Sequence, residues 1–193
     1  WRNALASAKD NSNPHPVITA ISRPLVAEID ASHWAELIEA VASSCEAKRF
    51  NTLADWNHML AAELRPWLPL VAKRSTVEDP KALASLLEFW VGATQLCQIL
   101  RLAKYLDDQF QPIPIADLAK HGVTAEQIKQ RQHDEKTTAL FCSLAQDRIG
   151  SANRAWKNIP VELRLFCRPL RALFRMRVAE FRLHHPRYAL LAE

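Results

Sequence analysis

The segment that most constrains the fold is residues 83–103, where apolar side chains leave almost no polar face on a helix. Asp79 and Pro80 precede it as a cap residue and a first-turn proline, which predicts that a helix begins there. Glu88 and Arg101 interrupt the apolar run, so we expect no transmembrane segment. A helix that is apolar around nearly its whole circumference must be surrounded by other elements. The sequence therefore predicts that this helix lies at the centre of a helical bundle.

Composition favours an all-α protein. Only three glycines occur among 193 residues, and β-branched residues are few beside alanine and leucine. Hairpins need glycine-type turns and strands favour β-branched side chains, so this composition disfavours β-hairpins and β-strands. No repeat or flexible linker divides the chain, and we expect one helical domain over residues 1–193. Because the chain starts at Trp1 without a methionine, we also expect further sequence of the same domain upstream.

Several local signals predict where other helices begin and end. Thr52 is placed to cap a helix, and Thr124 with Gln127 forms a capping-box pattern. Gly122 is suited to close the helix before that box, and Pro169 is expected to kink the last helix. Further helices are expected over residues 31–48, over residues 125–156 with a break, and over residues 160–184.

Cysteine and histidine patterns predict no metal site. The four cysteines lie far apart in apolar helical contexts, with no C-x-x-C pair and no histidine at ligand spacing. The seven histidines show no H-E-x-x-H pattern either. We therefore interpret the cysteines as small buried hydrophobic residues in a reducing compartment and predict no bound zinc. The cysteines are Cys45, Cys97, Cys142 and Cys167.

Four stretches of the chain share a pattern with one enzyme family. Residues 98–101, Gln-Ile-Leu-Arg, are similar to the N-I-L-R of an acidic motif, and residues 159–160 look like the L-P before a last helix. Residues 38–50, which include Arg49, resemble "I-x-g-m-x-x-D-l-x-x-x-R-y", and residues 1–17 resemble a W-r … h-P-v segment. In these stretches the chain resembles the squalene/phytoene synthase family.

This resemblance implies a fold and a chemistry. The expected fold is the isoprenoid synthase bundle of α-helices around a central cavity. Members of the family join two prenyl diphosphates head to head, with magnesium held by two D-x-x-x-D motifs on facing helices. Carboxylates four residues apart lie on one helix face, so they share a metal cluster. The metal then neutralises the charge that develops on the leaving diphosphate.

The sequence departs from the family at those acidic positions. Leu102 and Leu106 stand where the second motif has aspartates, and Asp107 and Asp108 follow one residue late, rotated by about 100° on a helix. No two of the 21 acidic residues are four positions apart. We therefore predict no catalytic residue, no metal ligand and no cofactor, with magnesium expected only if the chain is an enzyme after all. The remnant cavity or anion-binding candidates are Arg49, Arg101, Asp107 and Asp108.

The C-terminal quarter is strongly basic. Residues 148–193 carry 10 Lys/Arg against 3 Asp/Glu, whereas residues 1–147 carry 15 against 18. Arg164, Arg168, Arg171 and Arg175 are spaced to form one stripe on the last helix. Planar guanidinium groups suit carboxylate and phosphate acceptors, so we predict a partner-docking surface here. An acidic protein face, RNA and anionic lipid are all compatible partners.

Three functional hypotheses remain open from the sequence. The first is a catalytically inactive squalene/phytoene synthase-like protein that serves as a scaffold or assembly component of a larger complex. Non-catalytic relatives of the family include a mitochondrial assembly factor for respiratory complex I, which favours a mitochondrial over a cytoplasmic location. The second is an active prenyl transferase whose acidic motifs lie upstream. The third is an RNA- or ribonucleoprotein-associated structural protein.

Overall fold

The computed structural model describes residues 31–46, 49–100, 113–130 and 134–184, and these ranges contain helices but no β-strand. The predicted all-α class is therefore confirmed. In chain order the elements are α3 (Ala31–Glu46), α4 (Leu53–Leu64), the 3-10 helix η3 (Arg65–Trp67), α5 (Leu68–Ser75), α6 (Pro80–Leu100), α8 (Ile115–His121), α9 (Ala125–Lys129), α10 (Glu135–Asn158) and α11 (Val161–His184).

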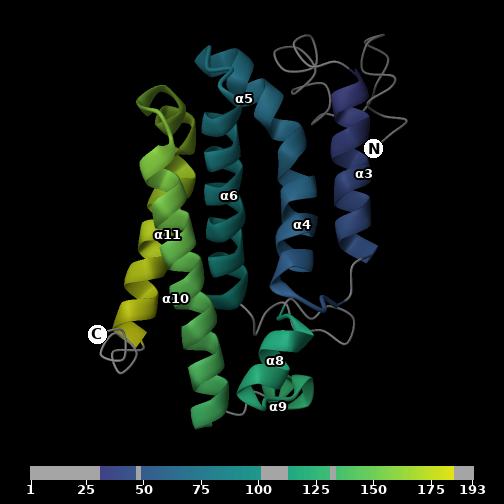
Figure 1. The fold of residues 1–193 in the computed structure, drawn as a ribbon, viewed down its shortest axis with the longest axis vertical. Coiled ribbons are helices and arrows are strands. Elements are labelled where there is room, and N and C mark those ends of the chain that lie inside the picture. The colour runs from purple at the N-terminus through teal and green to yellow at the C-terminus, as the bar shows by residue number, and fades with distance from the viewer. Residues whose placement is uncertain (1–30, 47–48, 101–112, 131–133, 185–193) are drawn as a thin grey trace, which may run out of the picture.

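Helix α6 occupies the centre of the bundle, as its apolar circumference predicts. It runs between α4 on one side and α10 and α11 on the other (Figure 1). Leu86, Phe89 and Leu96 on α6 are completely buried. A Cβ added to Gly92 would lie 3.2 Å from the Cβ of Ala152, so α6 and α10 approach closely there. The prediction of a central helix is confirmed as far as Leu100, and residues 101–103 lie outside the described residues.

By length and composition, α6 is apolar enough to cross a membrane, with a mean hydropathy of 1.3 over its best 18-residue window. Glu88 alone therefore does not exclude a membrane-spanning helix on composition, contrary to the reasoning from the sequence. The same composition is required of the core helix of a bundle, and α4, α5, α10 and α11 all pack against α6.

The predicted helix boundaries rest on specific hydrogen bonds. The Thr52 hydroxyl accepts from the Asp55 amide while the Asp55 carboxylate accepts from the Thr52 amide, at 3.2 and 2.8 Å. Thr124 and Gln127 form the same reciprocal box at the start of α9. Gly122 closes α8 with φ of 62°, a left-handed conformation that costs glycine little. These local predictions are confirmed.

Proline acts differently at two places in the chain. Pro66 lies in η3, and Pro69 lies in the first turn of α5, so both prolines sit where a missing amide donor is tolerated. Helix α11 instead continues through Pro169 and runs to His184 as one helix. The expected break after residue 125 is present, since α9 ends at Lys129 and α10 begins at Glu135.

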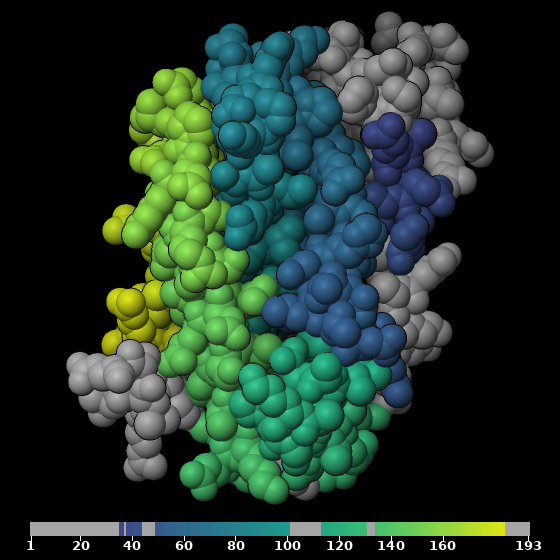
Figure 2. Space-filling model, in the orientation of Figure 1, coloured from purple at the N-terminus to yellow at the C-terminus, as the bar shows by residue number. Residues whose placement is uncertain are grey.

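Helices α8 and α9 lie at one end of the bundle. The amides of Ile115 and Ala116 donate to the carbonyls of Phe50 and Asn51 at 2.9 and 3.0 Å, which ties the start of α8 to the segment before α4. In the space-filling view, α8 and α9 cover the end of the bundle between α4 and α10 (Figure 2). This leaves the middle of the α4, α6 and α10 assembly to form a pocket.

Candidate functional site

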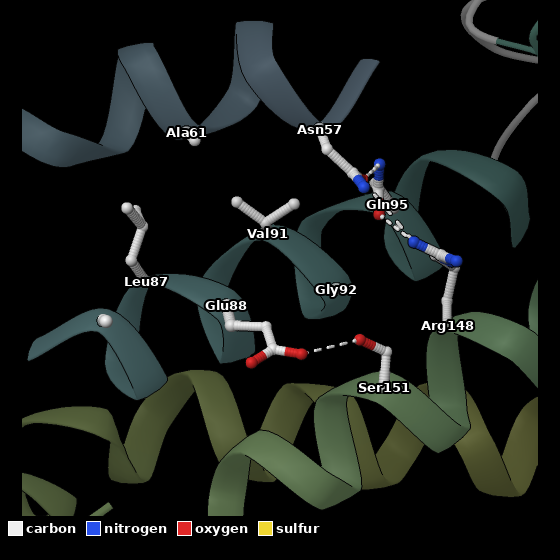
Figure 3. A pocket seen from close by; sticks show the side chains of 10 residues that line it. Asn57, Ala61, Leu87, Glu88, Val91, Gly92, Gln95, Arg148 and Ser151 are labelled. Atoms are coloured by element: carbon white, nitrogen blue, oxygen red, sulfur yellow. Dashed lines mark hydrogen bonds between the residues drawn. The ribbon is translucent and has the colours of Figure 1, made fainter. Parts of the chain in front are cut away.

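A pocket of about 280 Å³ opens between α4, α6 and α10. Figure 3 shows α6 running between α4 above and α10 below, with side chains from all three helices around the pocket. The wall is mainly apolar, and polar groups gather at one end. The lining residues are Asn57, Ala61, Ala84, Leu87, Glu88, Val91, Gly92, Gln95, Arg148 and Ser151.

The polar end of the pocket is a network of three side chains from three helices. Gln95 is completely buried, and its Nε2 donates to Asn57 Oδ1 at 2.7 Å. An NH group of Arg148 donates to Gln95 Oε1 at 3.1 Å and to Asn57 Oδ1 at 3.5 Å. Buried polar groups need such partners because leaving them unpaired is costly. The two amides therefore hold the guanidinium at the edge of the cavity.

Arg148 is only 9% exposed, yet no carboxylate among the described residues forms an ion pair with it. Burial lowers the pKa of its guanidinium, which the charges of Asp147 and Asp117 oppose. Its Nε is buried without a hydrogen-bond partner. Among the described residues, the guanidinium of Arg148 donates its hydrogen bonds to neutral amides and to no carboxylate, a setting that favours an anionic or hydrogen-bond-accepting ligand.

Glu88 is the one carboxylate among the described residues that line the pocket, and it accepts a hydrogen bond from the Ser151 hydroxyl at 3.3 Å. Magnesium prefers several hard oxygen ligands, usually carboxylates, in octahedral geometry. The described part of the pocket offers a single acid, two amides that are already engaged and an arginine. This donor set does not fit the magnesium cluster that the family resemblance implies.

Gln98, which replaces the asparagine of the N-I-L-R motif, makes a structural contact. Its Oε1 accepts a hydrogen bond from the indole nitrogen of Trp56 at 3.2 Å. Trp56 is completely buried and stacks on Phe50 with ring centroids 6.3 Å apart. The motif position therefore joins α6 to α4, next to the Asn57 and Gln95 pair.

Only one of the four sequence candidates for this cavity lies within the described residues. Arg49 is exposed and does not line it. Arg101, Asp107 and Asp108 lie outside the described residues, so their predicted roles stay predictions. The three residues that form the polar network were not singled out by the sequence. Gln95 carried a signal, as an amide within an almost wholly apolar helix, whereas Asn57 and Arg148 sit in ordinary polar stretches.

Two of the four arginines predicted for docking make contacts within the chain. Arg164 donates to the carbonyls of Ile159 and Lys157 at 2.8 and 3.3 Å, which satisfies acceptors at the end of α10. Arg171 donates to Asn153 Oδ1 at 3.0 Å, and its guanidinium lies 4.8 Å from the centre of the Trp156 ring. Both side chains therefore fasten α11 to α10.

The other two arginines point away from the bundle. Arg168 and Arg175 are exposed, and no partner among the described residues contacts their guanidinium groups. Their positions differ from those of Arg164 and Arg171 by about 20–60° around the helix. The predicted stripe is thus divided between an inner pair that contacts α10 and an outer pair that faces outward. Whether the outer pair docks a partner stays a prediction.

Comparison with known proteins gives one informative match. No protein-family model matches the chain. No curated protein matches it either. Among solved structures, the chain is similar to the crystal structure of squalene synthase HpnC from Alicyclobacillus acidocaldarius, with a TM-score of 0.65 and 19% identity. The match covers 94% of this chain and 71% of that one.

The chain has a squalene synthase-like fold. The fold class that the family resemblance implied, a helical bundle of the isoprenoid synthase type, is therefore confirmed. At 19% identity the likeness establishes the fold and carries no activity with it. Function has to be argued from the pocket and the surface of this chain.

Proposed function

We propose that this chain is a non-catalytic protein of squalene synthase-like fold that serves as a scaffold or assembly component of a larger complex. The observation that carries the proposal is the chemistry of the pocket on α6. Its polar end presents the buried Arg148 held by Asn57 and Gln95, whereas magnesium-dependent diphosphate ionisation needs a group of carboxylates. The sequence supports the same reading, because Leu102 and Leu106 cannot ligate a hard cation.

The assembly role is supported by a second feature, the exposed side of α11. This side carries large apolar side chains and arginines that have no ion-pair partner among the described residues, whereas the opposite side of the helix packs into the bundle. A basic helix of this kind suits a protein partner with an acidic surface. A mitochondrial location belongs to the same proposal and rests on the non-catalytic mitochondrial relative; imaging of the tagged full-length protein against a mitochondrial marker tests it.

The proposal is tested by incubating the purified protein with farnesyl or geranylgeranyl diphosphate and magnesium. We expect no pyrophosphate release above that of a heat-denatured sample. A matched double variant, Asp107→Ala with Asp108→Ala, tests the alternative that the chain is an active prenyl transferase. Metal-dependent release that this double variant abolishes would show that the two aspartates form an active site, and the non-catalytic proposal would then be wrong.

A further inference from the structure

Helix α11 has an exposed apolar side. Among the described residues, six of the nine large apolar side chains that are exposed belong to this one helix. Val161, Met176 and Leu183 are 68%, 67% and 77% exposed. Hydrophobic residues scattered singly over a surface need no explanation, but several gathered on one helix mark an interaction site. The six are Val161, Leu165, Phe166, Leu173, Met176 and Leu183.

The spacing on this side is that of a helix–helix seam. Small or apolar residues follow one another at intervals of 4, 3, 4, 3 and 4 residues, and all of them are exposed. On an α-helix these positions fall within a strip about 80° wide. The alternation of three and four is the pattern by which one helix packs along another. We name this strip the outer seam; its residues are Leu165, Pro169, Ala172, Met176, Ala179 and Leu183.

One flank of the outer seam is basic. Arg168, Arg175 and Arg182 each directly precede a seam residue, so they line the same edge at intervals of seven residues. All three are exposed, and no carboxylate among the described residues pairs with them. The other flank carries Phe166 and Leu173, which widen the apolar surface. Positive charge is thus concentrated on one edge, whereas Glu162 and Glu180 lie on the other flank.

We infer that the outer seam docks an amphipathic α-helix of a partner protein whose own apolar stripe is flanked by Asp and Glu. This inference rests on the assembly role proposed above and specifies the chemistry of the partner. The 3–4 spacing supplies the apolar contact, and the arginine edge supplies charge complementarity that fixes orientation and favours fast association. Ala172 and Ala179 leave room in the seam for large side chains of the partner.

Each of the other occupants is less complementary to this surface. In an antiparallel pair of α11 helices, the arginine edges of two copies would face each other, and like charges repel. In a parallel pair, the edge arginines would face Leu173 and Glu180, so only the contact of Arg175 with Glu180 would be favourable. Glu180 and Glu162 lie beside the apolar strip and oppose an anionic membrane. RNA would leave the apolar seam uncovered.

The test uses two synthetic helical peptides as probes. Both peptides carry leucine at the seam positions. One has glutamate and the other has lysine at all flanking positions, so two copies of the same peptide repel each other and each peptide stays monomeric. Binding of fluorescently labelled peptide to the purified protein is followed by anisotropy at low and high salt. We expect the glutamate peptide to bind at least about tenfold more tightly than the lysine peptide, with the difference shrinking as salt rises.

Two variants sharpen this experiment. Arg168→Glu, Arg175→Glu and Arg182→Glu together should reverse the preference, so that the lysine peptide binds more tightly. Met176→Asp, in the centre of the outer seam, should weaken the binding of both peptides by about tenfold or more, because it places a charge in an apolar contact. Arg154→Glu, on α10 and away from the seam, is the control and should change neither affinity. Circular dichroism checks that each variant keeps the helical fold.

Three results would overturn the inference. Equal affinity for the two peptides would contradict the predicted preference for an acidic helix. A concentration-dependent dimer in analytical ultracentrifugation that Met176→Asp dissolves would assign the seam to a second copy. Co-sedimentation with phosphatidylserine vesicles that the same variant abolishes would assign it to a membrane. None of these measurements depends on pyrophosphate release, so failure here is distinguishable from failure of the non-catalytic proposal.

Discussion

The two sides of α11 use the same residue type for different purposes. On the inner side, Arg171 lies 4.8 Å from the Trp156 ring and 5.2 Å from the Phe174 ring, and it donates a hydrogen bond to Asn153. On the outer side, Arg168 and Arg175 have no partner among the described residues. The comparison teaches that a regular arginine spacing does not specify a role. The neighbouring helix decides which guanidinium groups stabilise the fold and which stay exposed.

Hydrophobic residues on the two sides differ in the same way, and their truncation should give the largest effect. Phe174 is 1% exposed and packs on Phe89 with ring centroids 5.8 Å apart, whereas Met176 is 67% exposed. We expect Phe174→Ala to lower the free energy of unfolding by about 3–5 kcal/mol, because it removes buried area and leaves a cavity. Met176→Ala should change it by less than about 0.5 kcal/mol. Urea titration of both variants tests this, and equal losses would contradict the assignment of the two sides.

Arginine substitutions provide a matched pair. Arg171→Gln should cost about 1–3 kcal/mol of unfolding free energy, since it removes a half-buried hydrogen bond and the contacts with Trp156 and Phe174. Arg175→Gln, at an exposed position on the same helix, should cost less than about 0.5 kcal/mol. The same urea titration applies. If Arg175→Gln were the more damaging change, the outer arginine would have a structural role that the described contacts do not reveal.

Cys167 gives the inner side of α11 a pH-dependent contribution to stability. Burial raises the pKa of its thiol from 9.0 to about 11, although a hydrogen bond with Trp90 lowers it. The folded state therefore holds the proton more tightly than the unfolded state. The resulting stability is fully present below pH 9.0 and is lost as the pH rises towards 11.

The measurement compares the wild type with Cys167→Ala between pH 8.5 and pH 11, because other groups titrate equally in both. We expect the wild type to lose about 1–2 kcal/mol more than the variant over this range. Identical pH profiles would show that the thiol is solvated in the folded protein.

The smallest effect is expected at the boundary between the two sides, where Arg177 forms an ion pair with Glu180 one turn later. The Glu180 side chain is 42% exposed, so solvent weakens the attraction. Glu180→Gln should cost about 0.2–0.5 kcal/mol at low salt and nothing measurable at about 1 M salt. Thermal unfolding at both salt concentrations tests this, and a loss that salt does not reduce would indicate a contact other than the ion pair.

Local chemistry made several features of the fold predictable. The Thr52 and Thr124 caps and the Gly122 helix end depend on residues within a few positions of one another, so the sequence contains everything they need. The central place of α6 was predictable for a different reason. A helix that is apolar around its whole circumference is stable in water only when other helices cover it on all sides.

The polar network in the pocket was beyond sequence reasoning. Asn57, Gln95 and Arg148 are separated by 38 to 91 positions, and only the packing of α4, α6 and α10 brings them together. The resemblance to the squalene/phytoene synthase family implied a central cavity with acidic motif positions and named none of these three residues; Asp107 and Asp108, which it did point to, lie outside the described residues. Nothing in the stretch around Arg148 marks it as the residue that would be buried.

By itself, then, the sequence determined the helical class, the core helix, the caps and the absence of acid pairs at helical spacing, because each follows from composition or from neighbours along the chain. The tertiary structure decided which polar groups share the pocket and which arginines of α11 contact α10 rather than solvent. Those outcomes depend on the rotation and approach of whole helices, and a shift of about 20–60° around α11 separates an arginine that packs on Trp156 from one that is exposed.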